Sequence, residues 1–243
     1  MNSATRATEP PARPIPWQPA RVVAIRTETA RAKTFRLALP QPSDHRAGQH
    51  YVLRLTAPDG YTASRSYSVA SAPDGTGEIE LTVERLPDGE VSTFLHDVVV
   101  LGDELEVRGP IGGWFVWDGQ TPALLLAGGS GVVPFMAMLR LARATDRAER
   151  VRLVVSVRTV EDLYYADELP GPETTVVFTR RVPVGTARPP GRLSVADLAG
   201  LIRPDATVYL CGSNGFAEHA GDVLMSLGVP ADRIRVERFG PTG

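Results

Sequence analysis

Four consecutive residues, Arg65-Ser66-Tyr67-Ser68, place a cation, an aromatic ring and two hydroxyls in one short segment. Because side chains alternate along a strand, Arg65 and Tyr67 share one face, and Ser66 and Ser68 share the other. Such a strand can bring positive charge to a diphosphate, an apolar face to a flat ring and a hydroxyl to a ring nitrogen. These are the needs of a flavin nucleotide. The same residues also fit an ordinary strand with an exposed arginine.

A second candidate site lies in the other half of the chain, where an apolar run leads into Gly128, Gly129, Ser130 and Gly131, followed by Pro134. Glycines let a backbone approach a pyrophosphate, and the N-terminus of a following helix supplies free amides and a favourable dipole. Proline suits the first turn of that helix. The spacing is not the Gly-x-Gly-x-x-Gly fingerprint of the usual dinucleotide fold. A glycine turn after a strand is common, so this motif also depends on its context.

The elements that would carry the first motif alternate with a period of two between residues 21 and 117. In residues 78–84, three aliphatic side chains alternate with Glu80, Thr82 and two flanking glutamates. This alternation predicts strands with one buried face and one solvent-facing face. Pro-Asp-Gly turns separate several such strands, which favours a closed antiparallel barrel. One short helix is expected near residues 92–97.

After residue 121 the apolar runs become continuous, as in strands buried on both faces of a parallel sheet. We expect these strands at residues 123–127, 151–157, 174–179, 207–211 and 234–239. Helices are expected between them, at residues 133–144, 161–168, 194–201 and 214–227, the last with Asn214 as its N-cap and Gly228 as its end.

The predicted fold class is therefore two-domain, an antiparallel β-barrel followed by a doubly wound α/β domain with a parallel sheet. The predicted organisation is a disordered segment at residues 1–16, the barrel at 17–118 and the α/β domain at 119–243.

Composition narrows the range of functions. The chain has 243 residues, 43% hydrophobic and 22% charged, with a net charge of −2, so no attraction to nucleic acid or to a membrane surface is expected. Its single cysteine cannot form an internal disulfide or hold an iron–sulfur cluster, and no metal site is predicted. No apolar run is long enough to cross a membrane and no secretory signal is evident, so we expect a cytoplasmic protein without membrane insertion.

Taken in chain order, the Arg-Ser-Tyr-Ser strand, the Gly-Gly-x-Gly-x-x-Pro turn, Cys211-Gly212 and the near-terminal Glu237-x-Phe239 resemble the ferredoxin–NADP reductase superfamily. The resemblance spans about residues 19–239. It implies a barrel that binds a flavin and an α/β domain that binds a nicotinamide nucleotide.

In the first domain the resemblance implies that Arg65 contacts the flavin phosphate, Tyr67 packs on the ring and Ser68 lies near its N5 atom. Residues 89–95 resemble the diphosphate-binding segment of the FAD-type members, which favours FAD over FMN. The C-terminal aromatic is expected to cover the other face of the ring, with phenylalanine here in place of tyrosine. The implied flavin-binding residues are Arg65, Ser66, Tyr67, Ser68, His50, Gly89, Val91, Ser92, Thr93 and Phe239.

In the second domain the glycine turn is expected to bind the pyrophosphate, and Cys211 to face the nicotinamide without covalent chemistry. Arginines and hydroxyls rather than a carboxylate follow two strands, which favours NADP(H) over NAD(H). Solvated arginines are the alternative interpretation. The implied nucleotide-binding residues are Gly128, Gly129, Ser130, Gly131, Pro134, Ser156, Arg158, Thr179, Arg180, Cys211 and Gly212, and the implied catalytic residues are Ser68, Cys211 and Glu237.

The predicted function is that of an FAD-dependent NAD(P)H oxidoreductase. It would take hydride from NADPH onto FAD and pass electrons singly to a protein acceptor such as a ferredoxin, a flavodoxin, or an oxygenase or other metalloenzyme component. Two alternatives stay open at this point. The chain could reduce free flavin or a quinone, or it could be a flavin-binding electron-transfer subunit of a larger complex.

Overall fold

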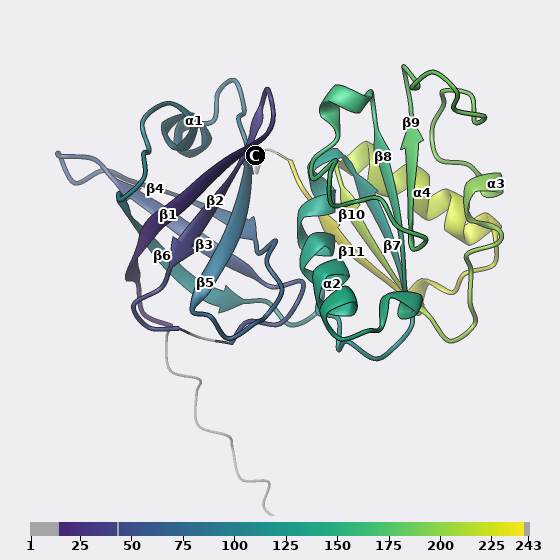
Figure 1. Ribbon diagram of the computed structural model, residues 1–243, viewed down its shortest axis with the longest axis horizontal. Helices are drawn as coiled ribbons and strands as arrows, with labels where there is room; N and C mark the ends of the chain where they lie inside the picture. The colour runs from purple at the N-terminus through teal and green to yellow at the C-terminus, as the bar shows by residue number, and fades with distance from the viewer. Residues whose placement is uncertain (1–14, 43, 241–243) are drawn as a thin grey trace, which may run out of the picture.

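The computed structural model describes residues 15–42 and 44–240 (Figure 1), so the predicted disordered segment at residues 1–16 lies almost wholly outside the described residues. The N-terminal domain is a six-stranded antiparallel sheet with strand order β4-β3-β6-β1-β2-β5. The end strands β4 and β5 meet at a single bridge between Val69 and Leu81, so the sheet curls into a barrel as predicted. Its elements are β1 (Gln18–Thr29), β2 (Ala32–Ala38), β3 (His50–Thr56), β4 (Thr62–Ser68), β5 (Glu78–Glu84), α1 (Glu90–Asp97) and β6 (Glu104–Ile111).

The alternating apolar side chains of these strands fill the barrel, with Phe35 and Leu37 of β2 almost completely buried. Helix α1 adds Val91 and Leu95 to the same core, and Ser92 in its first turn is also buried. The helix begins at Glu90 rather than near residue 92 as predicted, with Gly89 as its N-cap.

The C-terminal domain is a five-stranded parallel sheet with strand order β11-β10-β7-β8-β9, which confirms the predicted doubly wound α/β fold. Alternate strand residues support two cores on opposite faces of this sheet, as expected for strands buried on both sides. Helix α2 covers the face turned toward the barrel, and α3 and α4 cover the other (Figure 1). The elements are β7 (Ala123–Gly128), α2 (Val133–Ala144), β8 (Val151–Val157), β9 (Thr174–Phe178), α3 (Val195–Leu198), β10 (Thr207–Gly212), α4 (Asn214–Ser226) and β11 (Ile234–Arg238).

Two predicted helices differ from the structure. The helix predicted at residues 161–168 is only a 3₁₀ turn, Val160–Asp162, after which the backbone reverses at Tyr165 with φ 54°. A left-handed conformation costs a residue with a side chain about 1 kcal/mol or more, so other contacts must hold it. The helix predicted at 194–201 is the single turn α3, which Ser194 and Asp197 close as a capping box.

The ends of α4 also refine the prediction. Ser213, not Asn214, is the N-cap, because its side chain accepts a hydrogen bond from the amide of Phe216. The predicted end at Gly228 is confirmed by its left-handed backbone, with φ 76°. No helix in the described ranges combines the length and apolarity needed to cross a bilayer.

The face of β5 that was expected to meet solvent is instead covered by the second domain. Glu80 and Thr82 are only 5% and 6% exposed. Arg140 of α2 donates from Nη1 to Glu80 Oε2 at 2.7 Å and to the Ala70 carbonyl at 2.9 Å. Its remaining nitrogens pair with Glu168 at 2.6 and 2.8 Å. The expectation of a wet face was wrong here because alternation shows which residues share a face, not what covers it.

Candidate functional site

Strand β4 holds the Arg-Ser-Tyr-Ser motif beside β3, where Ser68 is opposite His50 and Tyr67 is opposite Tyr51. The Arg65 guanidinium is exposed and donates only to its neighbour's carbonyl, Ser64 O, at 2.7 Å. No carboxylate within the described residues forms an ion pair with it, so its charge is available to an anion. Burial raises the pKa of Tyr67 to about 12, which keeps the phenol neutral.

The N-terminus of α1 follows in the same domain. The Ser92 hydroxyl donates to the Gly89 carbonyl at 3.1 Å and accepts from the Leu86 amide at 3.2 Å, so it closes the turn that leads into the helix. A Cβ atom on Gly89 would lie 2.3 Å from Ser92 Oγ, which explains the glycine. Val91 points into the barrel core, so only its backbone amide can serve a ligand. The first-turn amides have no acceptor inside the helix and favour an anion, as the diphosphate prediction requires.

The four residues of the glycine turn divide into two kinds. Cβ atoms on Gly128 and Gly131 would lie 2.4 Å from the Phe216 ring and 2.1 Å from the Cys211 carbonyl oxygen. These two glycines are required by packing within the protein. A Cβ on Gly129 would meet nothing within 4 Å, and its φ is 55°. Open space for a ligand therefore lies at Gly129, and the neighbouring Ser130 is half-buried; both belong to the 3₁₀ turn Gly129–Val132 that leads into α2.

Cys211, Glu237 and Phe239 meet at the C-terminal edge of the sheet. Cys211 pairs in register with Glu237 on β11, and the Phe239 amide donates to the Gly212 carbonyl at 2.9 Å. Chain order reverses between β7 and β10, and ligands of open α/β sheets bind at such a switch point. Burial, with a contribution from the Glu237 carboxylate, raises the pKa of Cys211 well above its usual value. Its thiol therefore stays protonated, which fits the expected non-covalent role.

Burial raises the pKa of Glu237 from 4.5 to about 7, so the folded chain holds a proton there that the unfolded chain releases. Between about pH 4.5 and 7 this group removes stability as the pH rises. We expect Glu237→Gln to match the parent protein at pH 4 and to exceed it at pH 8 by about 1–2 kcal/mol, after allowance for the partial exposure of the carboxyl. Thermal unfolding at both pH values measures this difference. Glu218→Gln, on the exposed face of α4, is the control, and an equal gain at both pH values would contradict the assignment.

The residues predicted for the adenosine end lie farther along the same sheet edge. Ser156 is buried and opposite Gly128 in register, whereas Arg158 and Arg180 are exposed beyond β8 and β9. The Arg180 amide donates to the Arg158 carbonyl at 3.0 Å, which brings the two segments together. Thr179 follows β9 directly. The neighbouring Arg181 is not free, because it pairs with Glu161 at 2.7 Å. Hydrogen bonds from Thr159 and Arg181 lower the pKa of Glu161 to about 2, so a carboxylate stands beside these arginines.

The two half-sites belong to domains that pack directly on each other. Ala47 and Ala70, on either side of β3 and β4, are buried in the core built around α2. A Cβ on Gly48 would lie 2.8 Å from Met138 Cε of that helix. The end of β4 that carries Ser68 is thus held close to the helix that begins at the glycine turn.

Sequence reasoning missed the residues that make this contact, chiefly Arg140 and Tyr165. A detectable signal existed for the first, because an arginine in a largely apolar helix needs an anionic partner where it is buried. No such signal existed for Tyr165, since its partners are far away in the chain.

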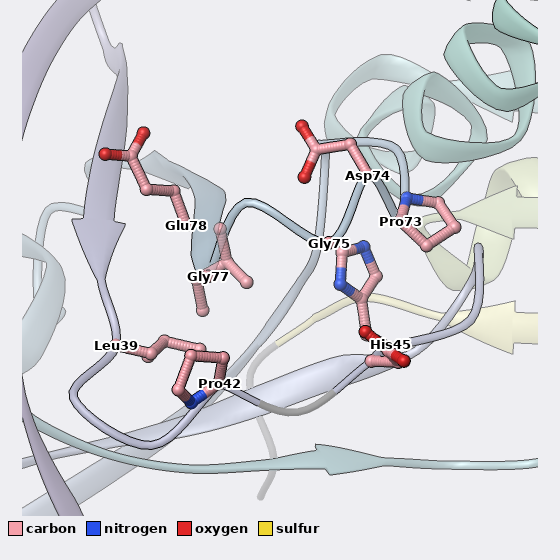
Figure 2. Close-up of a pocket in the computed structure, with 10 residues that line it drawn as sticks. Leu39, Pro42, His45, Pro73, Asp74, Gly75, Gly77 and Glu78 are labelled. Atoms are coloured by element: carbon pink, nitrogen blue, oxygen red, sulfur yellow. The ribbon is translucent and has the colours of Figure 1, made fainter.

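Figure 2 shows a separate hollow in the N-terminal domain, beside His45 and Asp74, which includes none of the predicted site residues.

Comparison with known proteins agrees with this geometry. Residues 19–116 match the family model of the oxidoreductase FAD-binding domain, and residues 125–222 match that of the oxidoreductase NAD-binding domain. The chain is 30% identical to the reductase component of propane 2-monooxygenase from Rhodococcus jostii, over 90% of this chain and 62% of that protein. It is 33% identical to the glycine betaine monooxygenase reductase subunit of Chromohalobacter salexigens, over 91% and 64%. It therefore spans slightly less than two thirds of these curated relatives.

A solved structure gives the same fold. The flavohem-like FAD/NAD-binding domain of nitric oxide dioxygenase from Vibrio cholerae superimposes with a TM-score of 0.81 at 27% identity, covering 92% of this chain and 99% of that one. The two domains are those of a flavin-dependent nicotinamide oxidoreductase, one binding FAD and the other binding the nicotinamide nucleotide. The chain belongs to the ferredoxin–NADP reductase superfamily.

Proposed function

We propose that the chain takes hydride from a reduced nicotinamide nucleotide onto FAD and passes electrons singly to an oxygenase component. The observation that carries this proposal is the packing of the two half-sites at one domain boundary, with the Ser68 end of β4 against the helix that follows the glycine turn. The monooxygenase reductases among the relatives support the choice of acceptor.

The residues present fit FAD. The Arg65 guanidinium, which has no carboxylate partner among the described residues, and the free amides of the first turn of α1 supply positive charge for a diphosphate. Tyr67 and Phe239 provide one aromatic face from each domain, and Ser68 provides a hydroxyl at the end of β4. FAD, when bound, supplies the hydride-accepting ring, while the protein supplies binding and orientation.

In the second domain, Gly129 and Ser130 would bind the nucleotide pyrophosphate at the start of α2. Cys211 and Glu237 would border the nicotinamide at the sheet edge. The thiol remains protonated, whereas the Glu237 carboxyl, with a pKa of about 7, is half protonated near neutral pH. It can therefore donate a hydrogen bond at its carboxyl oxygen in the acidic range and only accept one in the alkaline range.

An anaerobic titration of the FAD-loaded protein tests the proposal. Bleaching of the visible flavin absorbance by NADPH or NADH, faster than in Gly131→Ala, is the expected result. A flavin that neither nucleotide reduces would leave the chain as a flavin-binding electron-transfer subunit. Reduction of free flavin or quinone at least as fast as that of a purified oxygenase component would contradict the proposed acceptor.

NADP(H) is proposed as the preferred nucleotide because Arg158 and Arg180 lie together at the adenosine end. Arg180→Ala is expected to raise the KM for NADPH about 10-fold, the effect of one charge-assisted contact to a 2′-phosphate, and to leave the KM for NADH almost unchanged. Steady-state kinetics with both nucleotides measure the difference. Arg192→Ala is the control. Equal changes for the two nucleotides would remove Arg180 from the phosphate site.

A further inference from the structure

Tyr165 lies on a closed ring of hydrogen bonds that crosses the domain boundary. Its backbone amide donates to Glu28 Oε2 at 3.1 Å, and its hydroxyl is 2.5 Å from Thr82 Oγ1. Thr34 completes the ring, with its hydroxyl 2.7 Å from that of Thr82 and 2.6 Å from Glu28 Oε1. These four residues, which we call the interdomain hydrogen-bond cycle, join Tyr165 of the C-terminal domain to strands β1, β2 and β5 of the barrel.

Glu28 fixes the direction of the hydroxyl hydrogen bonds in the interdomain hydrogen-bond cycle. As a carboxylate it can only accept, so Thr34 donates to it. Thr34 must then accept from Thr82, and Thr82 must accept from the Tyr165 hydroxyl. Arg26 donates to the same carboxylate oxygen at 2.8 Å and balances its charge. The set of donors and acceptors is therefore complete, which is what makes a buried polar contact specific.

The interdomain hydrogen-bond cycle holds Tyr165 at two points, its backbone amide and its side-chain hydroxyl. A rotation of one domain against the other would break one of these two attachments. Tyr165 has a left-handed backbone, with φ 54°, and both its amide and its hydroxyl bond to residues of the barrel domain. Arg140 reinforces the contact through Glu80 on one side and Glu168 of the same loop on the other.

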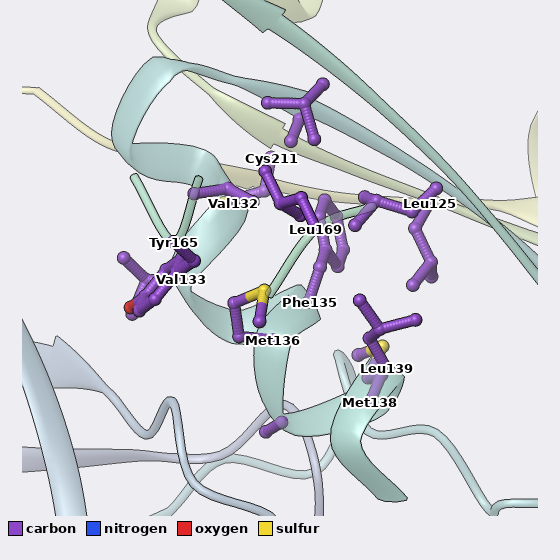
Figure 3. Close-up of a cluster of buried hydrophobic side chains, with 14 of the residues drawn as sticks. Leu125, Val132, Val133, Phe135, Met136, Met138, Leu139, Tyr165, Leu169 and Cys211 are labelled. Carbon is purple, nitrogen blue, oxygen red and sulfur yellow. The ribbon is translucent and has the colours of Figure 1, made fainter. Parts of the chain in front are cut away.

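The groups held in this way lie next to the two half-sites. Thr82 directly follows Leu81, whose bridge partner Val69 directly follows Ser68. On the other side, Tyr165 belongs to the same buried cluster as Val133 and Cys211 (Figure 3). Val133 is the first residue of α2, immediately after the glycine turn.

From this arrangement we propose that Tyr165 is a positioning residue, which sets the approach of the nicotinamide to the flavin by fixing the angle between the two domains through Glu28 and Thr82. The proposal rests on the proposed hydride transfer for its kinetic consequence, but not for its structural one. Tyr165 touches neither ligand in this scheme. Its loss should therefore slow the transfer of hydride and leave the binding of each ligand intact.

Three variants test the proposal in the full chain. Tyr165→Phe removes the hydroxyl from one domain, and Thr82→Val removes its partner from the other, so a folding defect in one leaves the other informative. Thr145→Val is the control, because its hydroxyl bonds to the Leu141 carbonyl of its own helix. The double variant should be little worse than either single one, since both delete the same hydrogen bond.

The structural readout is the distance between spin labels, measured by double electron–electron resonance. Labels on Val98→Cys in the barrel and Met225→Cys on α4 use two exposed positions, and the native Cys211 is buried from the reagent. We expect a broader or shifted distance distribution in both test variants and the parent distribution in Thr145→Val. This measurement does not depend on the proposed activity.

The kinetic readout is stopped-flow reduction of the bound flavin. Tyr165→Phe and Thr82→Val should reduce its limiting rate about 10-fold or more, with FAD content and nucleotide affinity unchanged. Unchanged distance distributions together with unchanged rates would overturn the proposal. An equal loss of nucleotide affinity would also overturn it, because Tyr165 would then act on binding. A parent protein that no nucleotide reduces would instead refute the proposed function, and the distance measurement would still decide the positioning role.

Discussion

Arg65→Ala is expected to weaken FAD binding by about 10- to 100-fold, the loss of one or two charge-assisted hydrogen bonds to a phosphate. The guanidinium is exposed and has no carboxylate partner among the described residues, so its removal leaves no buried charge behind. The fold should therefore survive, and the purified protein should be pale rather than yellow. Fluorescence titration of the apoprotein with FAD gives the dissociation constant directly.

Arg54→Ala is the matched control for this prediction. Arg54 lies on the neighbouring strand β3, but its guanidinium is engaged by Glu106 at 2.9 and 3.0 Å. Arg65→Lys should give an intermediate affinity, because an ammonium keeps the charge but lacks the planar pair of donors. If Arg65→Ala and Arg54→Ala bind FAD equally well, the phosphate contact must lie elsewhere.

Gly131→Ala is expected to destabilise the C-terminal domain by about 3 kcal/mol and to abolish reduction of the flavin by nicotinamide nucleotides. The added Cβ would lie 2.1 Å from the Cys211 carbonyl oxygen and 2.7 Å from the Gly212 amide. Both atoms are backbone, so no side chain can move aside, and the glycine turn must separate from β10. That movement would open the sheet edge where Cys211 and Glu237 meet.

Gly215→Ala provides the contrast. This residue lies in α4 with open space around its Cβ position, and alanine there should stabilise the helix by as much as about 1 kcal/mol. Denaturant unfolding of both variants, together with nucleotide-driven bleaching of the flavin, measures the two effects. A Gly131→Ala protein as stable and as rapidly reduced as the parent would show that the turn does not need to contact β10.

The sequence predicts the strands of both domains well because their apolar patterns are local. Strand β8 has the predicted bounds, and the other parallel strands differ from prediction by one residue. The two motifs also indicated the domain types correctly, since each depends on a short segment with its own backbone requirements.

What could not be predicted depends on contacts between the domains. Glu80 and Thr82 alternate with aliphatic residues as solvent-facing side chains do, but the second domain covers them. Residues 161–168 were predicted to form a helix, but the chain makes only one 3₁₀ turn and then reverses at Tyr165, whose amide and hydroxyl bond to Glu28 and Thr82 of the barrel. In both cases the deciding partners lie more than 50 residues away in the chain, beyond the reach of any local pattern.

The burial of Cys211 has a consequence for the durability of a protein that works with reduced flavin. Hydrogen peroxide oxidises the thiolate form of cysteine, and this thiol is fully buried with a pKa well above its usual value. Met136 and Met138 are also shielded, at 0% exposure. Among the described residues, the sulfur open to oxidation is that of Met225, which is 65% exposed on α4. Oxidative damage to sulfur is thereby directed to a surface helix, on the face of the sheet turned away from the barrel.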